Sequence, residues 1–334
     1  MNIVYTSDDN FVPQTCTGMV SVMENNKDSS IHFYILSKNI KPNHKQMITA
    51  LASHYGQQVD LIDLPSTEEL CGKSIDTGGW NNIVLSRLFL NTLLPEDVDK
   101  VLYMDGDTIV RKDLTNLYNT DISNHTLAAV IEPTVPGYRK EELGLSKDAN
   151  YYNAGVLLIN LKLWRERNTS QRILQYFEAH GGKLFANDQD AINGCLADEI
   201  LPVSISYNFC NTYDFYPYRA VRKWMGPKNS LSKQEYKDIC ADPTIVHFLG
   251  EERPWRYGNR HRFSRDFFKY YKKTPIGWDL KTRYDIIEHG WERYFFCFYC
   301  FNMITKPFPE IRLKIISTLI PVFMKIRKKK LKKK

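Results

Sequence analysis

Asn-Ile-Val-Tyr-Thr-Ser, at residues 2–7, is the first of three short apolar runs that decide the fold of this chain, and residues 31–36 and 59–64 repeat it. Near-continuous apolar runs of this length are typical of parallel strands covered on both faces. A helix is predicted between the second and third runs, over residues 41–55. The pattern therefore predicts a βαβαβ unit, the first half of a nucleotide-binding α/β sheet.

Further elements of the same kind follow. Strands are predicted at residues 100–110, 127–131, 156–160, 201–205 and 244–248, and helices at residues 82–94, 164–180 and 188–197. Past Gly258 the composition becomes aromatic and basic, so we predict that the core ends there. This gives a catalytic domain over residues 1–258 and a helical basic and aromatic extension over residues 259–334. No GxGxxG or GxxxxGK[ST] loop is found, which argues against dinucleotide redox chemistry and P-loop ATP use.

The formal net charge of +7 is local rather than global. Residues 325–334 hold eight of the 45 basic residues, which leaves 37 basic against 38 acidic side chains in the rest of the chain. A near-neutral body argues against a nucleic-acid partner. No apolar run reaches the roughly 18 residues that span a bilayer. Aromatic and aliphatic segments followed by lysines instead predict peripheral binding to an anionic membrane surface.

The seven cysteines are scattered and odd in number, and no secretory signal peptide is found. We therefore expect reduced thiols and a cytoplasmic location. Cys297 and Cys300 form a Cys-x-x-Cys without a second pair, and we interpret them as apolar packing residues among the neighbouring phenylalanines rather than as a zinc or redox site.

The clearest chemical signal is Val-Leu-Tyr-Met-Asp-Gly-Asp-Thr-Ile-Val at residues 101–110. Asp105 and Asp107 stand where a buried strand breaks, and ligands bind at the carboxyl ends of strands in open α/β sheets. His247 ends another apolar strand and would complete an O,O,N set of metal ligands. Such mixed ligands favour Mn²⁺, with Mg²⁺ as the alternative. The metal would act as a Lewis acid on a leaving diphosphate.

Four other segments carry polar side chains at strand or helix ends. Arg253, in Gly250-Glu-Glu-Arg-Pro-Trp255, could bind the same diphosphate through its guanidinium fork. Asp188-Gln-Asp190 begins a predicted helix, where carboxylates are ordinarily caps. The remaining two segments are a turn at Asp8-Asp9-Asn10 and a polar start to a strand at Asn153-Ala-Gly155.

Taken in order from residue 2 to residue 255, these segments resemble glycosyltransferase family 8. These are retaining enzymes of the GT-A fold that include bacterial lipopolysaccharide glucosyl- and galactosyltransferases and glycogenin. The resemblance implies a mixed, mostly parallel central sheet flanked by helices, a UDP-sugar donor and a divalent metal. It also implies site residues. The metal ligands are Asp105, Asp107 and His247. The donor-binding residues are Asp8, Asn10, Arg87, Asp105, Asn153, Ala154, Gly250 and Arg253. The residues beside the reacting sugar are Asp188 and Gln189.

Two features bear on the chemistry that the resemblance implies. Arg253 replaces the lysine of the family's HxxGxxKPW element, which keeps the charge but changes the shape. Gln189 is the side chain best placed below the anomeric carbon, and an amide is a poor nucleophile beside the paired carboxylates of retaining glycosidases. A front-face reaction is then attractive, with Gln189 and Asp188 as the catalytic residues: Gln189 positions the sugar and stabilises its developing positive charge, and Asp188 binds sugar hydroxyls or, in the alternative double displacement, acts as the nucleophile. Glu132 is an acceptor-side candidate.

The sequence thus predicts a retaining, Mn²⁺-dependent hexosyltransferase that moves galactose or glucose from a UDP-sugar to a surface glycan such as lipopolysaccharide or capsule. The acceptor is expected to be lipid-linked, and the enzyme to work at the inner face of the plasma membrane. Two alternatives stay open. A haloacid-dehalogenase-like phosphatase also carries an apolar strand followed by Asp-x-Asp. A catalytically idle glycan- or membrane-binding scaffold would bind UDP without turnover.

Overall fold

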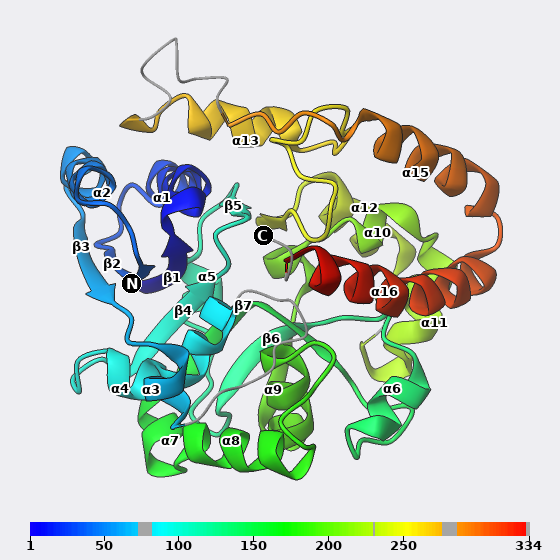
Figure 1. Cartoon of the computed structure of the whole chain (residues 1–334), viewed down its shortest axis with the longest axis horizontal. Coiled ribbons are helices and arrows are strands. Elements are labelled where there is room, and N and C mark those ends of the chain that lie inside the picture. The colour runs from blue at the N-terminus through cyan, green and yellow to red at the C-terminus, as the bar shows by residue number, and fades with distance from the viewer. Residues whose placement is uncertain (73–81, 230, 276–285, 332–334) are drawn as a thin grey trace.

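The computed structural model describes residues 1–72, 82–229, 231–275 and 286–331. Its centre is a seven-stranded sheet in the order β3-β2-β1-β4-β7-β6-β8 (Figure 1). Strand β7 runs antiparallel to both of its neighbours and the other pairings are parallel. The strands are β1 (Asn2–Asp8), β2 (His32–Lys38), β3 (Gln58–Asp63), β4 (Lys100–Met104), β6 (Leu127–Ile131), β7 (Tyr152–Asn160) and β8 (Ile200–Val203). The predicted mixed, mostly parallel α/β sheet is confirmed.

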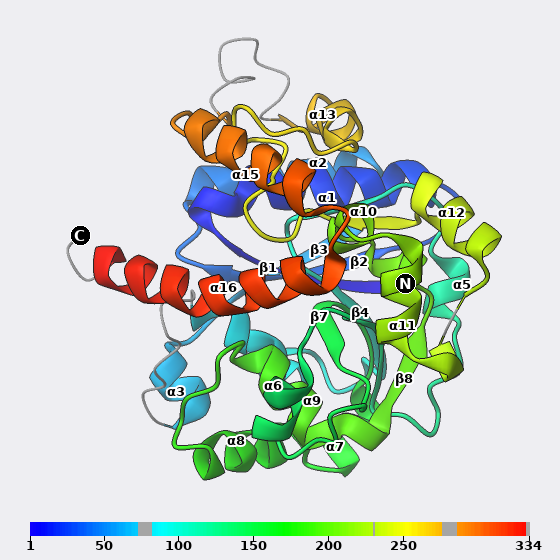
Figure 2. The same ribbon diagram turned by 90° about the vertical axis from the view of Figure 1, so that its right-hand side faces the viewer.

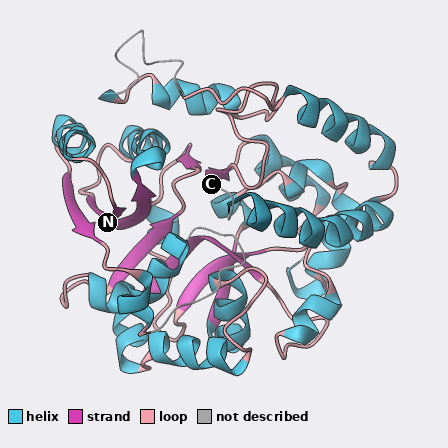
Figure 3. Cartoon of the chain, in the orientation of Figure 1, coloured by secondary structure: helices cyan, strands magenta, loops and turns pink. Residues whose placement is uncertain are grey.

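Helices cover both faces of this sheet (Figure 3). Successive side chains of a strand point to opposite faces. Tyr5 and Ile35 accordingly lie in one apolar core, and Val4 and Tyr34 in the other. The first core is closed by α1 (Val12–Asn25), α2 (Pro42–His54), α5 (Thr115–Tyr118), η4 (Ile205–Asn208), α10 (Thr212–Phe215), α11 (Tyr218–Met225), α12 (Lys233–Ala241) and α13 (Ser264–Tyr271). The second is closed by α3 (Thr67–Cys71), η2 (Asn82–Phe89), α4 (Leu90–Leu93), α7 (Leu161–Glu166), α8 (Thr169–Ala179) and α9 (Asp188–Leu196). Short elements outside these groups are η1 (Asp9–Phe11), α6 (Gly137–Glu142), η3 (Ala197–Glu199) and η5 (Pro227–Asn229).

The strand order reverses between β1 and β4, and the edge at the carboxyl ends of these two strands is here named the crevice. The chain passes from β1 to β2 and β3 on one side, and then returns to add β4 on the other side of β1. Ligands of open α/β sheets bind at such a reversal, outside the carboxyl ends of the strands. Asp8 ends β1 and Asp105 follows β4, so both carboxylates lie at this edge.

A second, two-stranded sheet brings distant parts of the chain to the same place. The strand predicted over residues 100–110 is split, because β4 ends at Met104 and β5 (Thr108–Val110) leaves the main sheet to pair with β9 (Ile245–His247). Gly106 lies in the break without a positive φ. A Cβ there would lie 2.9 Å from Cδ1 of Phe11, so the position requires glycine for space rather than for backbone twist.

Two predicted helices are wrong in detail. Residues 82–94 form a 3₁₀ helix, η2, followed by the single turn of α4, rather than one α-helix. Residues 164–180 are two helices, α7 and α8, because Asn168 adopts a left-handed conformation with φ 49° between them. Hydrophobic periodicity continued through both breaks, so periodicity alone did not reveal them.

The apolar core continues past Gly258, contrary to the prediction. Phe267 and Tyr271 of α13 are buried in the same core as α1. Their helical spacing puts both rings on one face, and α13 packs on α1. The division of the chain into a catalytic part up to residue 258 and an extension beyond it stays a prediction.

The extension ends in two helices on the outside of the molecule, α15 (Glu292–Thr305) and α16 (Pro309–Leu331) (Figures 1 and 2). Within the described residues, none of the helices combines the length and the apolar character needed to span a bilayer. Cys297 and Cys300 are exposed on α15, so their interpretation as buried packing residues is wrong. No disulfide joins any of the seven cysteines, all of which belong to the described part of the chain. The predicted basic membrane contact falls on residues 325–334: residues 325–331 belong to the backbone of α16, whereas their side chains and residues 332–334 lie outside the described part of the structure.

Candidate active site

Three predicted metal ligands meet at the crevice. Asp105 follows β4, Asp107 precedes β5, and His247 ends β9 opposite Thr108. One ligand atom from each lies within 4.8 Å of the others, and Nε2 of His247 is 3.3 Å from Oδ1 of Asp107. Two carboxylates and an imidazole form a donor set that suits a divalent transition metal.

The space for the imidazole depends on a glycine in β7. A Cβ at Gly155 would lie 2.3 Å from Cε1 of His247 and 2.7 Å from its Nδ1. Because no carbon atom can approach that closely, a side chain at position 155 would displace the histidine. Sequence analysis named Gly155 only as part of the polar start of a strand, whereas in the structure its lack of a side chain leaves room for the imidazole of His247.

A chain of amides fixes the orientation of that imidazole. Nδ1 of His247 is 2.9 Å from Oδ1 of Asn208, in η4, and an amide oxygen can only accept, so Nδ1 carries the proton and Nε2 faces the carboxylates. Asn208 in turn donates to Oδ1 of Asn153 at 2.8 Å, and Asn153 donates to Glu132 at 2.8 Å. Asn208 was missed by sequence reasoning, because nothing in the Asn-Phe-Cys-Asn segment at residues 208–211 signals a ligand-supporting role.

Arg87 joins the metal-type cluster to helix α9. Its Nη2 lies 2.9 Å from Oδ1 of Asp105, and its Nε lies 3.0 Å from Oδ2 of Asp188. Nη1 donates to the carbonyl of Ala154, and the guanidinium lies over the ring of Tyr103 with its carbon 4.5 Å from the ring centre. Arg87 is 4% exposed, so it is a buried cation held by two carboxylates at the crevice floor.

The ionisation of the acidic groups differs. Burial, together with the negative charge of Asp105, raises the pKa of Asp188 to about 6 although Arg87 opposes the rise. Burial would also raise the pKa of Asp107, but Arg253 and His247 outweigh it and hold the value at about 2. Burial lowers the pKa of His247, yet Asp107 and Asp105 raise it overall. Protons and a metal cation therefore compete for this site.

Arg253 reaches the same cluster from the loop after β9. Its Nη2 lies 2.9 Å from Oδ2 of Asp107. Its Nε is buried without a hydrogen-bond partner among the described residues. A partly buried guanidinium with an unused donor beside a metal-type site is suited to binding an anion such as a phosphate. Gly250, at the start of this loop, has φ +84°, which only glycine adopts readily.

The turn after β1 lines a separate hollow of about 220 Å³. Its walls are Asp8, Asp9 and Asn10 together with Lys38 and Asn39 from the end of β2. Asp8 also accepts a hydrogen bond from the backbone of Phe11 at 3.1 Å. Two predicted residues, Asp8 and Asn10, thus share one cavity at the edge of the crevice. Lys38 and Asn39 were missed, since they become neighbours of this turn only through the pairing of β1 with β2.

The start of α9 faces β7 rather than solvent. Gln189 accepts from the backbone of Ala154 at 3.0 Å, and its Nε2 lies 3.3 Å from the hydroxyl of Tyr151. Asp190 is 1% exposed and binds Arg139 at 3.0 Å. Asp188 pairs with Arg87, as described above. Each of these carboxylates is paired with an arginine, and Asp190 also accepts from the backbone of Ala186 at 2.7 Å, a cap-type hydrogen bond at the start of the helix.

The fold and the crevice indicate an α/β enzyme with a candidate divalent-metal centre. Beside that centre lie the buried Arg87, which pairs with two carboxylates, and Arg253, which pairs with Asp107. Comparison with known proteins then identifies the family to which this chain belongs. Residues 2–259 match the profile described as Glycosyl transferase family 8. The chain belongs to glycosyl transferase family 8 and is a glycosyltransferase of the GT-A fold.

Relatives agree with this assignment. A putative glycosyltransferase of Haemophilus influenzae is 31% identical over 76% of this chain and 73% of its own length. A lipopolysaccharide 1,2-glucosyltransferase of Escherichia coli is 25% identical over 81% of this chain and 76% of its own. Among solved structures, galactosyltransferase LgtC in complex with donor and acceptor sugar analogues superposes with a TM-score of 0.70 and is 26% identical, covering 82% of this chain and 96% of that one. Membership of this family excludes the phosphatase alternative.

Proposed function

We propose that this glycosyltransferase moves galactose or glucose from a UDP-sugar to a bacterial surface glycan, with retention at the anomeric carbon and dependence on Mn²⁺. The observation that carries the proposal is the meeting of Asp105, Asp107 and His247 at the crevice with Arg253 beside them. A metal and a cationic side chain at one place can together neutralise the diphosphate of a nucleotide-sugar. Relatives named as lipopolysaccharide glucosyl- and galactosyltransferases support the choice of hexose and acceptor class.

In this proposal the donor extends from the hollow after β1 to the cluster of Asp105, Asp107 and His247. Asp8 and Asn10 bind the uridine part from the hollow after β1, and Asp105, Asp107 and His247 hold the metal at the diphosphate. The metal supplies Lewis-acid stabilisation of the charge that grows on the leaving group. Arg253, on the loop that begins at Gly250, donates to the same phosphates through its guanidinium fork, and its unused Nε suits this role.

The sugar would lie over β7 and the start of α9. Arg87, Asn153 and Ala154 line this side, and Asp188 is the carboxylate placed to accept from sugar hydroxyls. Gln189 has its amide oxygen tied to the backbone of Ala154, which suits a positioning role and not attack on the sugar. We therefore favour the front-face route. The acceptor oxygen forms a bond to the anomeric carbon as the bond between that carbon and the phosphate oxygen of UDP breaks. The departing phosphate takes the proton of the acceptor hydroxyl.

Glu132 is the acceptor-side candidate. Its carboxylate accepts from Asn153 at 2.8 Å, and this contact with a proposed donor-binding residue supports the role. A lipid-linked acceptor would reach the site from a membrane. Large apolar side chains of the two C-terminal helices are exposed, among them Phe296 at 71% and Met303 at 79%, and the basic residues follow in sequence. These features support peripheral binding at the cytoplasmic face through residues 259–334.

The test is release of UDP from a panel of UDP-sugars, with Mn²⁺ or with EDTA, by the wild type and by Asp107→Ala. Metal-dependent turnover of a UDP-hexose that is lost in the variant is the expected result, and it names the donor. UDP binding without turnover of any sugar, with and without candidate glycan acceptors, would favour the idle scaffold instead.

A further inference from the structure

The loop from Gly250 to Arg256, here named the donor loop, is held from outside by helix α15. The hydroxyl of Tyr299 in α15 donates to Oε1 of Glu252. Glu252 is 5% exposed, its other oxygen has a long contact of 3.5 Å with Asn211, and the backbone of Arg260 makes a weaker contact with the carboxylate. A buried carboxylate requires hydrogen-bond donors, so the Tyr299 hydroxyl is its main stabilising partner in the described part of the chain.

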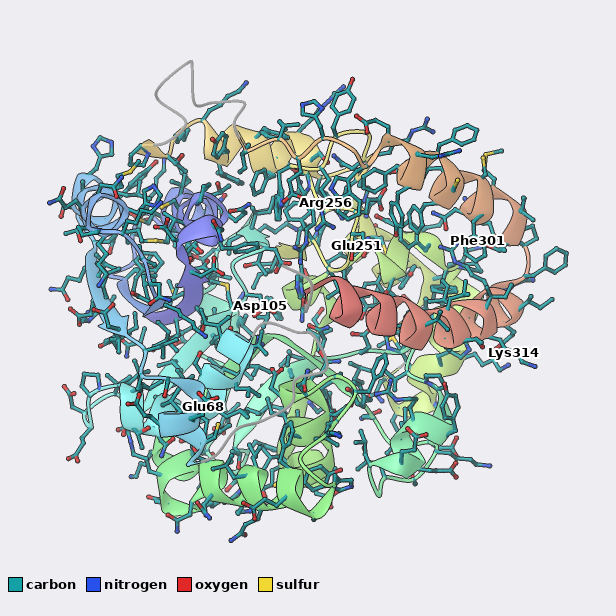
Figure 4. The ribbon with its side chains drawn as sticks, in the orientation of Figure 1. Glu68, Asp105, Glu251, Arg256, Phe301 and Lys314 are labelled. Carbon is teal, nitrogen blue, oxygen red and sulfur yellow. The ribbon has the colours of Figure 1, made fainter. Side chains whose placement is uncertain are left out.

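A second contact holds the far end of the loop. The guanidinium carbon of Arg256 lies 3.8 Å from the ring centre of Trp291, directly before α15, and Nε of Arg256 lies 2.9 Å from Oε2 of Glu288. The backbone of Glu288 bridges the loop, since it donates to Trp255 at 2.7 Å and accepts from Tyr257 at 2.9 Å. Figure 4 shows Arg256 and Glu251 on this loop, which descends from the layer of α13 and α15 toward Asp105.

Arg253 lies between these two anchors. It is adjacent to Glu252 and three residues before Arg256, and its own side chain extends to Asp107. The family match ends at residue 259, so the contacts from Glu288, Trp291 and Tyr299 come from a segment outside it. We propose that Tyr299 and Trp291 are positioning residues that fix the donor loop so that Arg253 faces the diphosphate of the donor. The inference rests on the proposed UDP-sugar function.

Tyr299→Phe tests the first anchor, because it keeps the ring and removes the hydroxyl, which donates to Glu252 and also accepts from the backbone N–H of Arg260. Tyr294→Phe is the matched control. It lies on the same helix and packs against Trp291, and its hydroxyl makes no hydrogen bond recorded within the described residues. Loss of the hydrogen bond to the buried Glu252, together with the one from the backbone of Arg260, is expected to weaken UDP binding by about fivefold. Trp291→Leu tests the second anchor and is expected to weaken UDP binding by about threefold.

The experiment uses the full chain with Mn²⁺ and measures UDP affinity by calorimetry, donor KM and kcat, melting temperature, and amide hydrogen exchange of residues 250–257. Tyr299→Phe and Trp291→Leu should raise the UDP dissociation constant and the donor KM more than they lower kcat, and should speed exchange in the loop. Tyr294→Phe should match the wild type in each measurement.

Equal UDP affinity and equal loop exchange in Tyr299→Phe, Trp291→Leu and the wild type would overturn the proposal. A fall in melting temperature with unchanged KM would also overturn it, since that indicates a structural contact only. Absence of UDP binding by the wild type would refute the proposed donor and with it the role of Arg253. Faster loop exchange in Tyr299→Phe than in Tyr294→Phe would then still show that α15 holds the loop.

Discussion

Gly155→Ala is expected to disable the metal centre while leaving the fold intact. The added Cβ would lie 2.3 Å from Cε1 of His247, about 1.2 Å closer than the roughly 3.5 Å at which two carbon atoms rest. The histidine is 2% exposed and tied to Asn208, so it cannot retreat without moving Nε2. Metal–ligand distances tolerate shifts of about 0.2 Å. We expect Mn²⁺ affinity to fall by roughly 10- to 100-fold, and unfolding free energy to fall by about 1–3 kcal/mol.

The assay is a Mn²⁺ titration that follows the free ion by electron paramagnetic resonance, paired with urea unfolding. Gly194→Ala is the matched control, because its Cβ would lie 2.0 Å from the hydroxyl of Tyr176 in α8 and would overpack a position outside the metal cluster. The control should lose stability and keep its Mn²⁺ affinity. Wild-type Mn²⁺ affinity in Gly155→Ala would refute the assignment of His247 as a ligand held in place by this glycine.

Three further outcomes are expected. Asn208→Ala removes the acceptor that fixes the tautomer of His247, and Mn²⁺ affinity measured by the same titration should fall by about tenfold with little change in melting temperature. Donor turnover should fall as the pH drops through about 6, where Asp188 takes up a proton. Because bound Mn²⁺ neutralises Asp105, added Mn²⁺ should move this limb of the pH–rate profile to lower pH. A profile that is flat from pH 7 to 5 at low Mn²⁺ would contradict a role for the Asp188 carboxylate. Glu199→Gln should cost on the order of 1–2 kcal/mol in urea unfolding at pH 7 and leave turnover unchanged, because the carboxylate pairs with two arginines. Those arginines and Thr126 outweigh burial and lower its pKa from 4.5 to about 2, so the stability it adds is present above pH 4.5, and the gap between variant and wild type should shrink as the pH falls from there toward 2.

Local patterns in the sequence were sufficient for the sheet and for most of the site. Parallel strands buried on both faces must be apolar along their length, so β1, β2 and β4 could be recognised without knowing their partners. Because the carboxyl ends of parallel strands share one edge, Asp8 and Asp105 could be expected together from their positions after β1 and β4. His247 and Arg253 followed from the ordered motifs of family 8.

The sequence by itself therefore determined the α/β class, the family and the residues with metal-binding chemistry, because each of these is a property of short segments. Only the tertiary structure decided how those segments support one another. The pairing of β5 with β9 brings His247 to Asp107 across 140 positions of sequence, and Gly155 and Asn208 then fix the imidazole. The attachment of α15 to the donor loop is also a tertiary contact. Steric room, tautomer choice and the neighbours of a buried charge are set by atoms far apart in the chain, and no local pattern encodes them.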